Sequence, residues 1–326
     1  MPSLIALVVG AVALPAVTIL IVAAAEWVIS HLRPKAQRRV RPWVWLSLAC
    51  IMIAVTLIYP IVVSLGLSLR GADGSAWAGF TNFIWAFGTE MRPILLNNLL
   101  WLIVFPVGVT AVAVLMAVLL NKVRYEKVAR VILILPTAVS FTAAAVTWRQ
   151  MYTYAPAGRT QLGVFNAVLQ AFGIEPVAWL ARPAGADQWM NNLSLIMVAV
   201  WASLGIALLI ITAAVKAVPQ ELNEAARLDG ASEWGVFLHV TLPTIWPSVL
   251  TVITTQIMFA LKIFDIVYIM TNGNNGTDVV ANKLYNEVFR NPTNLGHAAA
   301  IAVLLLVAAI PVLWLNLRNM RKEGLT

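Results

Sequence analysis

Runs of about 20 apolar residues recur along this chain, and they limit the folds open to it. Seven runs can be counted, at 4–29, 43–69, 94–120, 131–151, 193–215, 245–270 and 296–317. Backbone polar groups in lipid must be satisfied within the segment, so each run is predicted to be a helix. The short alternating segments of a membrane barrel do not occur. The sequence therefore predicts an all-α polytopic membrane protein with seven transmembrane helices.

The composition agrees with that class. Hydrophobic residues make up 61% of the chain and charged residues 11%, whereas soluble domains are about 25% charged. The first run is not expected to be a signal peptide, because its Lys and Arg follow the apolar stretch and the stretch is too long. Cys50 is the only cysteine, so no disulfide within the chain is possible.

The basic residues predict an orientation. Fourteen Lys and Arg lie in the 31–42, 121–130 and 216–243 loops and the C-terminal tail, and seven lie in the loops of the other side. Basic loops stay in the cytoplasm, so the N-terminus is expected outside and the C-terminus inside. The net charge of +8 has the same explanation, and no nucleic-acid partner is predicted.

Several kinds of chemistry have no sequence signal here. No glycine is followed by lysine, so the chain has no Walker-type phosphate loop. The three histidines are isolated, and neither a zinc-protease motif nor a Gly-x-Ser-x-Gly elbow occurs. We therefore expect no catalytic residue, no metal and no cofactor on this chain. A retinal-type receptor is disfavoured, because the last run has no lysine.

A short polar segment at 216–243, called the cassette below, lies between the fifth and sixth runs. Pro219 is suited to be the first residue of a helix that continues to Leu228, and Gly230 is suited to a left-handed turn. Ser232 is a candidate N-cap for a second helix to about Val240, which Pro243 would stop. The residues alone leave two interpretations open. The apolar side chains at 228, 234 and 237 could fill a pocket in a partner protein, or they could insert into the lipid bilayer.

The spacing of the cassette carries a family resemblance. Glu224-Ala225-Ala226, three residues, Gly230, nine residues and Val240-x-Leu242-Pro243 resemble the EAA loop, which marks permease subunits of binding-protein-dependent ABC importers. Val240 stands where that loop usually has Ile. Pieces that resemble the carbohydrate-uptake branch, with its maltose-type permeases, are Leu135-Pro136, Ser140, Trp148, Gly163, Asn166, 217–222, 229–232, Phe264-Asp265, Tyr268, Thr271 and 296–300.

The resemblance covers about 43–322 and implies a division of the chain. Residues 1–42 would form an extra N-terminal helix with a basic cytoplasmic loop, and 43–326 a six-helix permease core with its coupling loop at 216–243. Where the family usually shows Gly-Gly-Pro, this chain has Gly273-Asn274-Asn275. That departure leaves the shape of the outer loop undetermined.

The resemblance also implies function and partners. The chain would be a non-catalytic permease subunit of a sugar importer, for an oligosaccharide, in a bacterial or archaeal cytoplasmic membrane. A second homologous permease, two ATPase subunits that bind ATP and Mg, and an extracytoplasmic sugar-binding protein would complete the system. The residues implied to couple to the ATPase are Glu224, Ala225, Ala226, Asp229, Gly230, Trp234, Phe237, Leu242 and Pro243.

A substrate path is predicted from polar residues within the runs and from the resemblance. Lys262 and Asp265 are three residues apart and are expected on one helix face, where they would contact sugar or only pair with each other. Gln256 is a mid-membrane hydrogen-bonding group. The maltose-type pattern adds six positions, each of which could instead serve helix packing. The full set is Thr137, Ser140, Phe141, Trp201, Ser203, Gln256, Phe259, Lys262 and Asp265.

Two alternative functions stay open at this stage. An importer for another solute, such as glycerol phosphate, would favour unpaired basic residues in the path, and only Lys262 is available there. A secondary transporter would need an ion-coupling site and no ATPase, and the spacing of the cassette argues against it.

Overall fold

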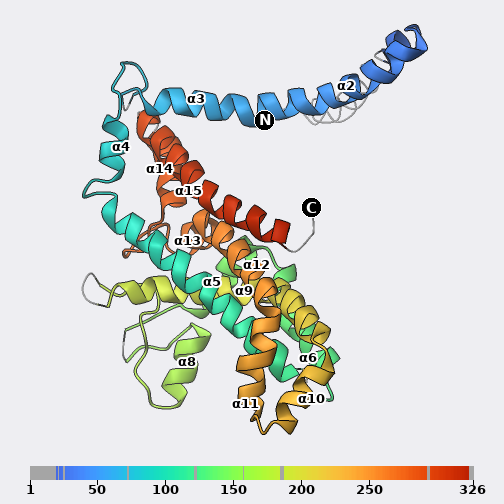
Figure 1. The fold of residues 1–326 in the computed structure, drawn as a ribbon. Helices are drawn as coiled ribbons and strands as arrows, with labels where there is room; N and C mark the ends of the chain where they lie inside the picture. The colour runs from blue at the N-terminus through green and yellow to red at the C-terminus, as the bar shows by residue number, and fades with distance from the viewer. Residues whose placement is uncertain are drawn as a thin grey trace. The chain divides into compact units, whose positions relative to one another are not determined.

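The computed structural model describes residues 20, 22–24, 26–71, 73–120, 123–156, 158–183, 187–291 and 294–322. Its regular elements are helical, apart from one isolated β-bridge between Arg70 and Trp77 (Figure 1). The chain divides into two compact units, Met1–Ser64 and Leu65–Thr326, and the division falls within helix α3. The all-helical class predicted from the apolar runs is confirmed.

The first described span is longer than expected. Helix α2 (Pro34–Ile53) continues through the π-helical segment η1 (Ala54–Ile58) into α3 (Tyr59–Ser68), forming a 35-residue candidate span. Pro34 lies in the first turn, where its missing N–H has no partner to lose. Most of the basic loop predicted at 31–42 is therefore helical. The predicted first span at 4–29 lies largely outside the described residues.

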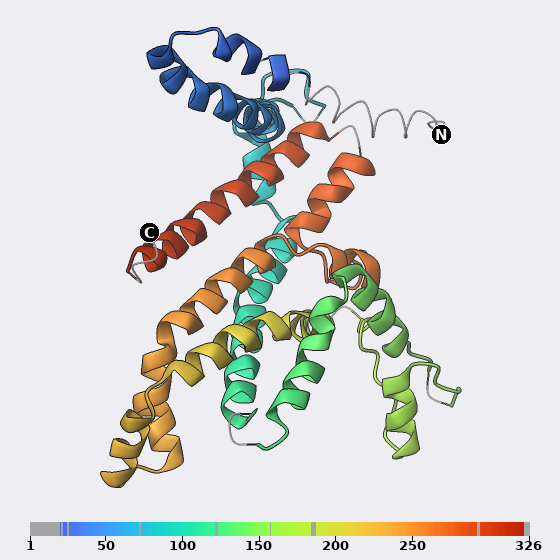
Figure 2. The ribbon, with the colours of Figure 1, turned by 90° about the vertical axis from the view of Figure 1, so that its right-hand side faces the viewer.

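The second unit holds the remaining helices. In chain order they are α4 (Thr81–Ala86), α5 (Arg92–Leu120), α6 (Glu126–Ile134), the 3-10 turn η2 (Leu135–Ala138), α7 (Phe141–Met151), α8 (Val164–Ala171), α9 (Trp189–Ala217), α10 (Gln220–Leu228), α11 (Glu233–Val236), the π-helical segment η3 (Phe237–Thr241), α12 (Leu242–Leu261), α13 (Asp265–Met270), α14 (Val280–Phe289) and α15 (Leu295–Lys322). Figures 1 and 2 show α10 and α11 at one end of this unit and α14 at the other.

Among the described residues, five helices are long and apolar enough to cross a membrane, or six if one bent pair counts as a span. The long spans are Pro34–Ser68, Arg92–Leu120, Trp189–Ala217, Glu233–Leu261 and Leu295–Asn316. A multi-span helical membrane protein is therefore established. The number seven and the orientation stay predictions.

The run at 131–151 is not one straight helix. Its two parts, Glu126–Ala138 and Phe141–Met151, are bent by 100°. Pro136 lacks the N–H that a continuing helix would use. Ser140 then starts the new helix, because its hydroxyl accepts a hydrogen bond from the backbone N–H of Ala143 at 3.2 Å.

The run at 245–270 is also broken, after Leu261. Lys262 caps the C-terminus of α12 and Asp265 begins α13. A cation is favoured at a helix C-terminus and a carboxylate at an N-terminus, so each charge suits the helix end where it lies. The expectation that Lys262 and Asp265 share one helix face is therefore wrong, since the apolar pattern cannot reveal a break between them.

Pro243 does not stop the second cassette helix as predicted. The helix continues from Glu233 to Leu261, with Pro243 in the first turn of α12. The π-helical segment η3 lies directly before it, and the N–H of Leu242 bonds the carbonyl of Phe237, five residues back. This wider turn rearranges the carbonyls that a proline would otherwise meet.

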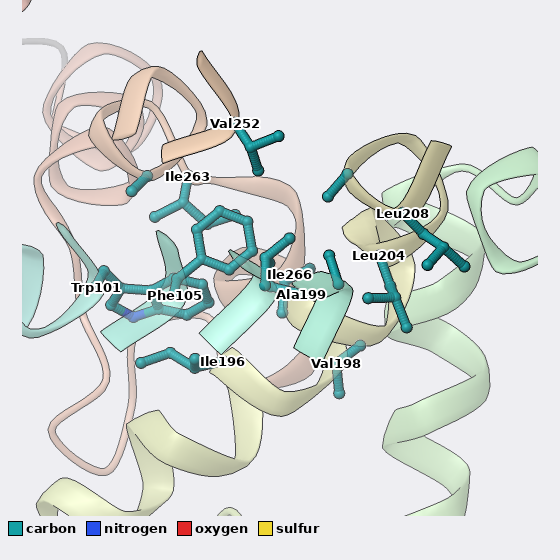
Figure 3. Close-up of a cluster of buried hydrophobic side chains, with 14 of the residues drawn as sticks. Trp101, Phe105, Ile196, Val198, Ala199, Leu204, Leu208, Val252, Ile263 and Ile266 are labelled. Atoms are coloured by element: carbon teal, nitrogen blue, oxygen red, sulfur yellow. The ribbon is translucent and has the colours of Figure 1, made fainter. Parts of the chain in front are cut away.

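The core of the second unit lies where α5, α9 and α12 pack together (Figure 3). Trp101 and Phe105 of α5 and Leu208 and Ile211 of α9 are buried there. Gly205 allows a close approach, because a Cβ at that position would lie 1.9 Å from Oγ1 of Thr137. Small residues that let helices approach are typical of membrane interfaces.

The departure at Gly273-Asn274-Asn275 forms a turn held by asparagines. Asn272 and Asn275 have positive φ values of 54° and 57°. The amide of Asn275 donates to the carbonyl of Leu180 at 2.9 Å, and that of Asn97 donates to the carbonyl of Gly276 at 2.8 Å. These bonds join the loop after α13 to the loop before α9 and to helix α5.

Candidate coupling surface and translocation path

The turn of the cassette is built as its sequence predicts. Helix α10 spans Gln220–Leu228, with Pro219 as its N-cap rather than its first helical residue. Gly230 has φ +87°, a conformation that favours glycine. The N–H of Ala231 reaches the carbonyl of Ala226 at 3.0 Å, which closes the helix end. The hydroxyl of Ser232 accepts from the N–H of Gly235 at 3.2 Å, so the predicted N-cap is confirmed.

Two side-chain contacts brace the cassette. Nε of Arg227 donates to Oε1 of Glu233 at 2.7 Å, which links α10 to α11 across the turn. This hydrogen bond raises the pKa of the Arg227 guanidinium above its usual value. The hydroxyl of Thr241 donates to Oδ1 of Asn223 at 3.4 Å, which ties α10 to η3. None of these four residues was among the predicted site residues. Each contact joins residues on opposite sides of the turn, and sequence spacing does not show how the turn brings them together.

The predicted coupling residues form an exposed surface. Glu224, Ala225, Asp229 and Gly230 are exposed, and Leu228 is 89% exposed at the end of α10. A Cβ at Gly230 would have no neighbour within 4 Å in the part of the chain that the structure describes.

The α11 side of this surface is aromatic. Trp234 is 66% exposed, and its ring lies 5.3 Å from that of Phe237. Pro243 is exposed as well, and Ala226, Phe237 and Leu242 are half-buried. An exposed apolar patch beside acidic groups is suited to a protein partner.

Part of the predicted path comes together where the two broken spans meet. The rings of Phe141 and Phe259 are 6.3 Å apart, and Nζ of Lys262 lies 5.6 Å from the centre of the Phe259 ring. Ser140 is exposed directly before Phe141, and Phe259 is 38% exposed. These residues form an accessible aromatic surface with a cation at its edge.

Asp265 is linked to the same region by Thr142, a residue that was not among the predicted path residues. The hydroxyl of Thr142 lies 3.4 Å from Oδ1 of Asp265, which joins α7 to α13. Nη1 of Arg149 donates to the carbonyl of Ile269 at 3.1 Å along the same pair of helices. Among the described residues, Lys262 and Asp265 form no ion pair with each other.

Trp201 lies in a different group. Its ring meets that of Trp148 edge-on at 5.4 Å, and Trp148 stacks on Phe165 of α8 at 5.6 Å. Tyr152 and Trp179 complete this aromatic cluster. Burial raises the pKa of the Tyr152 hydroxyl to about 12. Helix α8 packs through Phe165 into the cluster.

The remaining predicted path residues are less accessible. Ser203 and Gln256 are buried, and Oγ of Ser203 and Oε1 of Gln256 have no hydrogen-bond partner among the described residues. The hydroxyl of Thr137 donates to the carbonyl of Ile134 at 2.5 Å, within the bend. Thr137 thus has a packing role in this conformation. No cluster of three or more metal-ligating side chains occurs in the described part of the chain.

Broken membrane spans that meet at an accessible surface, together with an exposed cassette at the other end, define a membrane transport subunit. Residues 109–320 match the family model of the binding-protein-dependent transport system inner membrane component. The chain belongs to this family, in its carbohydrate-uptake branch. It is a non-catalytic, multi-pass permease subunit of an ABC importer in the inner membrane. Membership excludes the secondary-transporter and receptor alternatives.

Two relatives are similar over most of the chain. The alpha-glucoside transport system permease protein AglF of Rhizobium meliloti (strain 1021) is 37% identical, covering 87% of this chain and 84% of that protein. The osmoprotective compounds uptake permease protein GgtC of Synechocystis is 38% identical, covering 84% of this chain and 97% of that protein.

A solved structure shares the fold. It is the bacterial alginate ABC transporter in complex with an alginate pentasaccharide-bound periplasmic protein, with a TM-score of 0.71 at 20% identity. The match covers 89% of this chain and 96% of that chain. Members of this family function together with an external binding protein and with the other subunits of an ABC transporter.

Proposed function

We propose that this chain forms half of the translocation path for an oligosaccharide and transmits the ATPase stroke through its cassette. The observation that carries the proposal is the braced helix–turn–helix at Gln220–Val236, which exposes Leu228 and Trp234 between two long spans. The names of AglF and of the alginate transporter both concern saccharides, which supports this substrate class.

The coupling residues would act as a rigid unit. Glu224, Ala225, Ala226, Asp229 and Gly230 would seat against the ATPase, and Trp234, Phe237, Leu242 and Pro243 would carry the motion into the next span. The bond between Arg227 and Glu233 favours this role, because it couples α10 to α11. A push on α10 would then move α12, and with it Phe259 at the path.

The path would be lined where the broken spans meet. Phe141 and Phe259 would stack on the apolar face of a sugar ring, and Ser140, Lys262 and Asp265 would bond its hydroxyls. Trp201 would support the path from the neighbouring aromatic cluster. The buried groups of Ser203 and Gln256 would join the path only in another conformation, and Thr137 would act through packing.

The assembly follows from the missing phosphate loop and from the basic loops. ATP and Mg would bind two partner ATPase subunits, and a second homologous permease would complete the path. The cassette would face the cytoplasm, with the N-terminus outside and seven spans in all. Residues 1–42 would be an addition to a permease core at 43–326.

Uptake in reconstituted vesicles tests this function. The chain, its partner permease, the ATPase and the binding protein are reconstituted with ATP inside, and entry of a labelled α-linked oligosaccharide is measured. ATP-dependent entry that needs the binding protein is expected. A transporter that accepts amino acids but no saccharide would contradict the substrate class, and a chain that purifies without an ATPase would contradict the coupling role.

An anionic solute is the second candidate. Lys262 is exposed and has no ion pair among the described residues. An exposed cation beside an aromatic ring suits a carboxylated or phosphorylated sugar. Competition by acidic and neutral oligosaccharides in the same vesicles separates the two, because only an anion-selective path would favour the acidic competitor.

A further inference from the structure

An apolar groove of about 640 Å³ lies between α5 and the segment from α11 to α12. Val107, Ala111 and Leu115 of α5 form one wall, and Trp246, Val249 and Ile253 of α12 form the other. None of these six residues belongs to the coupling surface or to the path proposed above. The groove lies entirely within the second unit.

The length of the groove matches one leaflet of a bilayer. Its α5 wall extends from Val107 to Leu119, which is about 18 Å at about 1.5 Å per residue. Half of a hydrocarbon core of about 30 Å is about 15 Å. A transmembrane helix would need a groove as long as the full hydrocarbon core, whereas an acyl chain extends through only one leaflet. The groove is therefore suited to an acyl chain from the leaflet on the cassette side.

The cassette end of the groove carries both signs of charge. Glu233 and Trp234 line the groove there, and Glu233 also lines an adjoining polar hollow with Asn223, Arg227 and Thr241. Nε of Arg227 bonds Glu233 at 2.7 Å, and the guanidinium has further N–H donors that can reach a phosphate. The carboxylate can accept from an ammonium group.

We propose that this groove binds a phospholipid whose headgroup joins a phosphate to a primary ammonium. One acyl chain would fill the apolar groove, the phosphate would meet Arg227, and the ammonium would meet Glu233. Such a lipid would connect α5 to the brace of the cassette. A choline headgroup cannot donate hydrogen bonds to Glu233, and a glycerol headgroup offers it only neutral hydroxyl donors, so both should bind less well.

Quenching of Trp246 by brominated acyl chains tests the site. The assembled transporter is placed in nanodiscs of phosphatidylcholine containing increasing brominated phosphatidylethanolamine, phosphatidylcholine or phosphatidylglycerol. The signal of Trp246 is the difference between the wild type and Trp246→Phe, because the chain has 13 tryptophans. Half-quenching is expected at about tenfold less phosphatidylethanolamine than phosphatidylcholine, which corresponds to one hydrogen bond to a charged group.

Variants separate the headgroup from the groove. Glu233→Gln should remove the preference for ethanolamine over choline while acyl quenching persists. Ala111→Trp should fill the groove and abolish quenching, whereas Ala213→Trp, at an exposed alanine of α9 outside the groove, should not. Equal quenching by the three wild-type lipids, or a preference for phosphatidylglycerol, would overturn the assigned headgroup. No quenching at all would mean that protein covers the groove.

Discussion

The hydroxyl of Thr142 lies 3.4 Å from Oδ1 of Asp265, so the first turns of α7 and α13 meet directly after the breaks in their spans. Helix N-termini inside a membrane unit expose backbone donors that a continuous helix would hide. Broken helices of this kind line substrate sites in transporters. The proposed path would therefore run between these two helices and beside Phe141 and Phe259.

A bulky residue at Gly230 is expected to uncouple transport. A Cβ there meets no atom of the described residues within 4 Å, so a tryptophan would project into the space that the ATPase would occupy. Gly230→Trp should insert normally, lose most ATP-dependent uptake and bind the ATPase less well. Gly230→Asn is the matched control, because asparagine tolerates the left-handed φ of +87° and adds little bulk. Normal uptake by Gly230→Trp would refute the docking role.

The two aromatic groups should respond differently to alanine. Phe259 is partly exposed at the path, so Phe259→Ala should weaken sugar transport by about tenfold with little change in thermal stability. Trp201 packs edge-on to Trp148, so Trp201→Ala should lower the melting temperature of the purified complex as well as uptake. Unchanged uptake by either variant would remove that ring from the path.

Lys262 is expected to set the preference for charged solutes. Lys262→Gln should weaken competition by an acidic oligosaccharide by about fivefold and leave a neutral one unchanged, because the cation has no ion pair among the described residues. Lys262→Arg keeps the charge and should behave like the wild type. If competition by both oligosaccharides weakens equally in Lys262→Gln, the residue affects the shape of the path and not its preference for charge.

Lys283 should be important for stability. Its Nζ lies 2.6 Å from Oε1 of Glu90 and 2.8 Å from Oε1 of Glu287, and the Glu287 side chain is only 2% exposed. Lys283→Met leaves that carboxylate buried without its cation, which costs about 3–5 kcal/mol. The measurement is thermal unfolding in detergent. A double variant, Lys283→Met with Glu287→Leu, should recover much of the loss.

The same cluster predicts a pH dependence. The hydrogen bond from Lys283 lowers the pKa of Glu90, so this contribution to stability is lost as the pH falls through that lowered value. Burial acts to lower the pKa of Lys283, but the hydrogen bonds to Glu287 and Glu90 raise it overall. The contribution of Lys283 is lost as the pH rises through its raised value. The contribution of the cluster to stability should be constant between the ordinary pKa values of 4.5 for Glu90 and 10.5 for Lys283, should decline outside that range, and should be absent in Lys283→Met.

The local structures could be predicted from the chain alone. The bounds of α10, the left-handed Gly230 and the Ser232 cap follow from side chains that bond backbone within a few residues. The long spans at Arg92–Leu120 and Trp189–Ala217 follow from apolar length alone. These features depend on neighbours in the chain, so a single sequence contains what is needed to predict them.

Which predicted path residues meet depends on the packing of the helices in three dimensions. Phe141 and Phe259 are more than 100 residues apart in the chain (259 − 141 = 118), yet their rings are 6.3 Å apart. Trp201 packs on Trp148 in another group. The helix breaks between Lys262 and Asp265, although the apolar pattern predicted both on one face of a single helix. Such contacts depend on how helices pack in three dimensions, and apolar residues can satisfy many packings equally well.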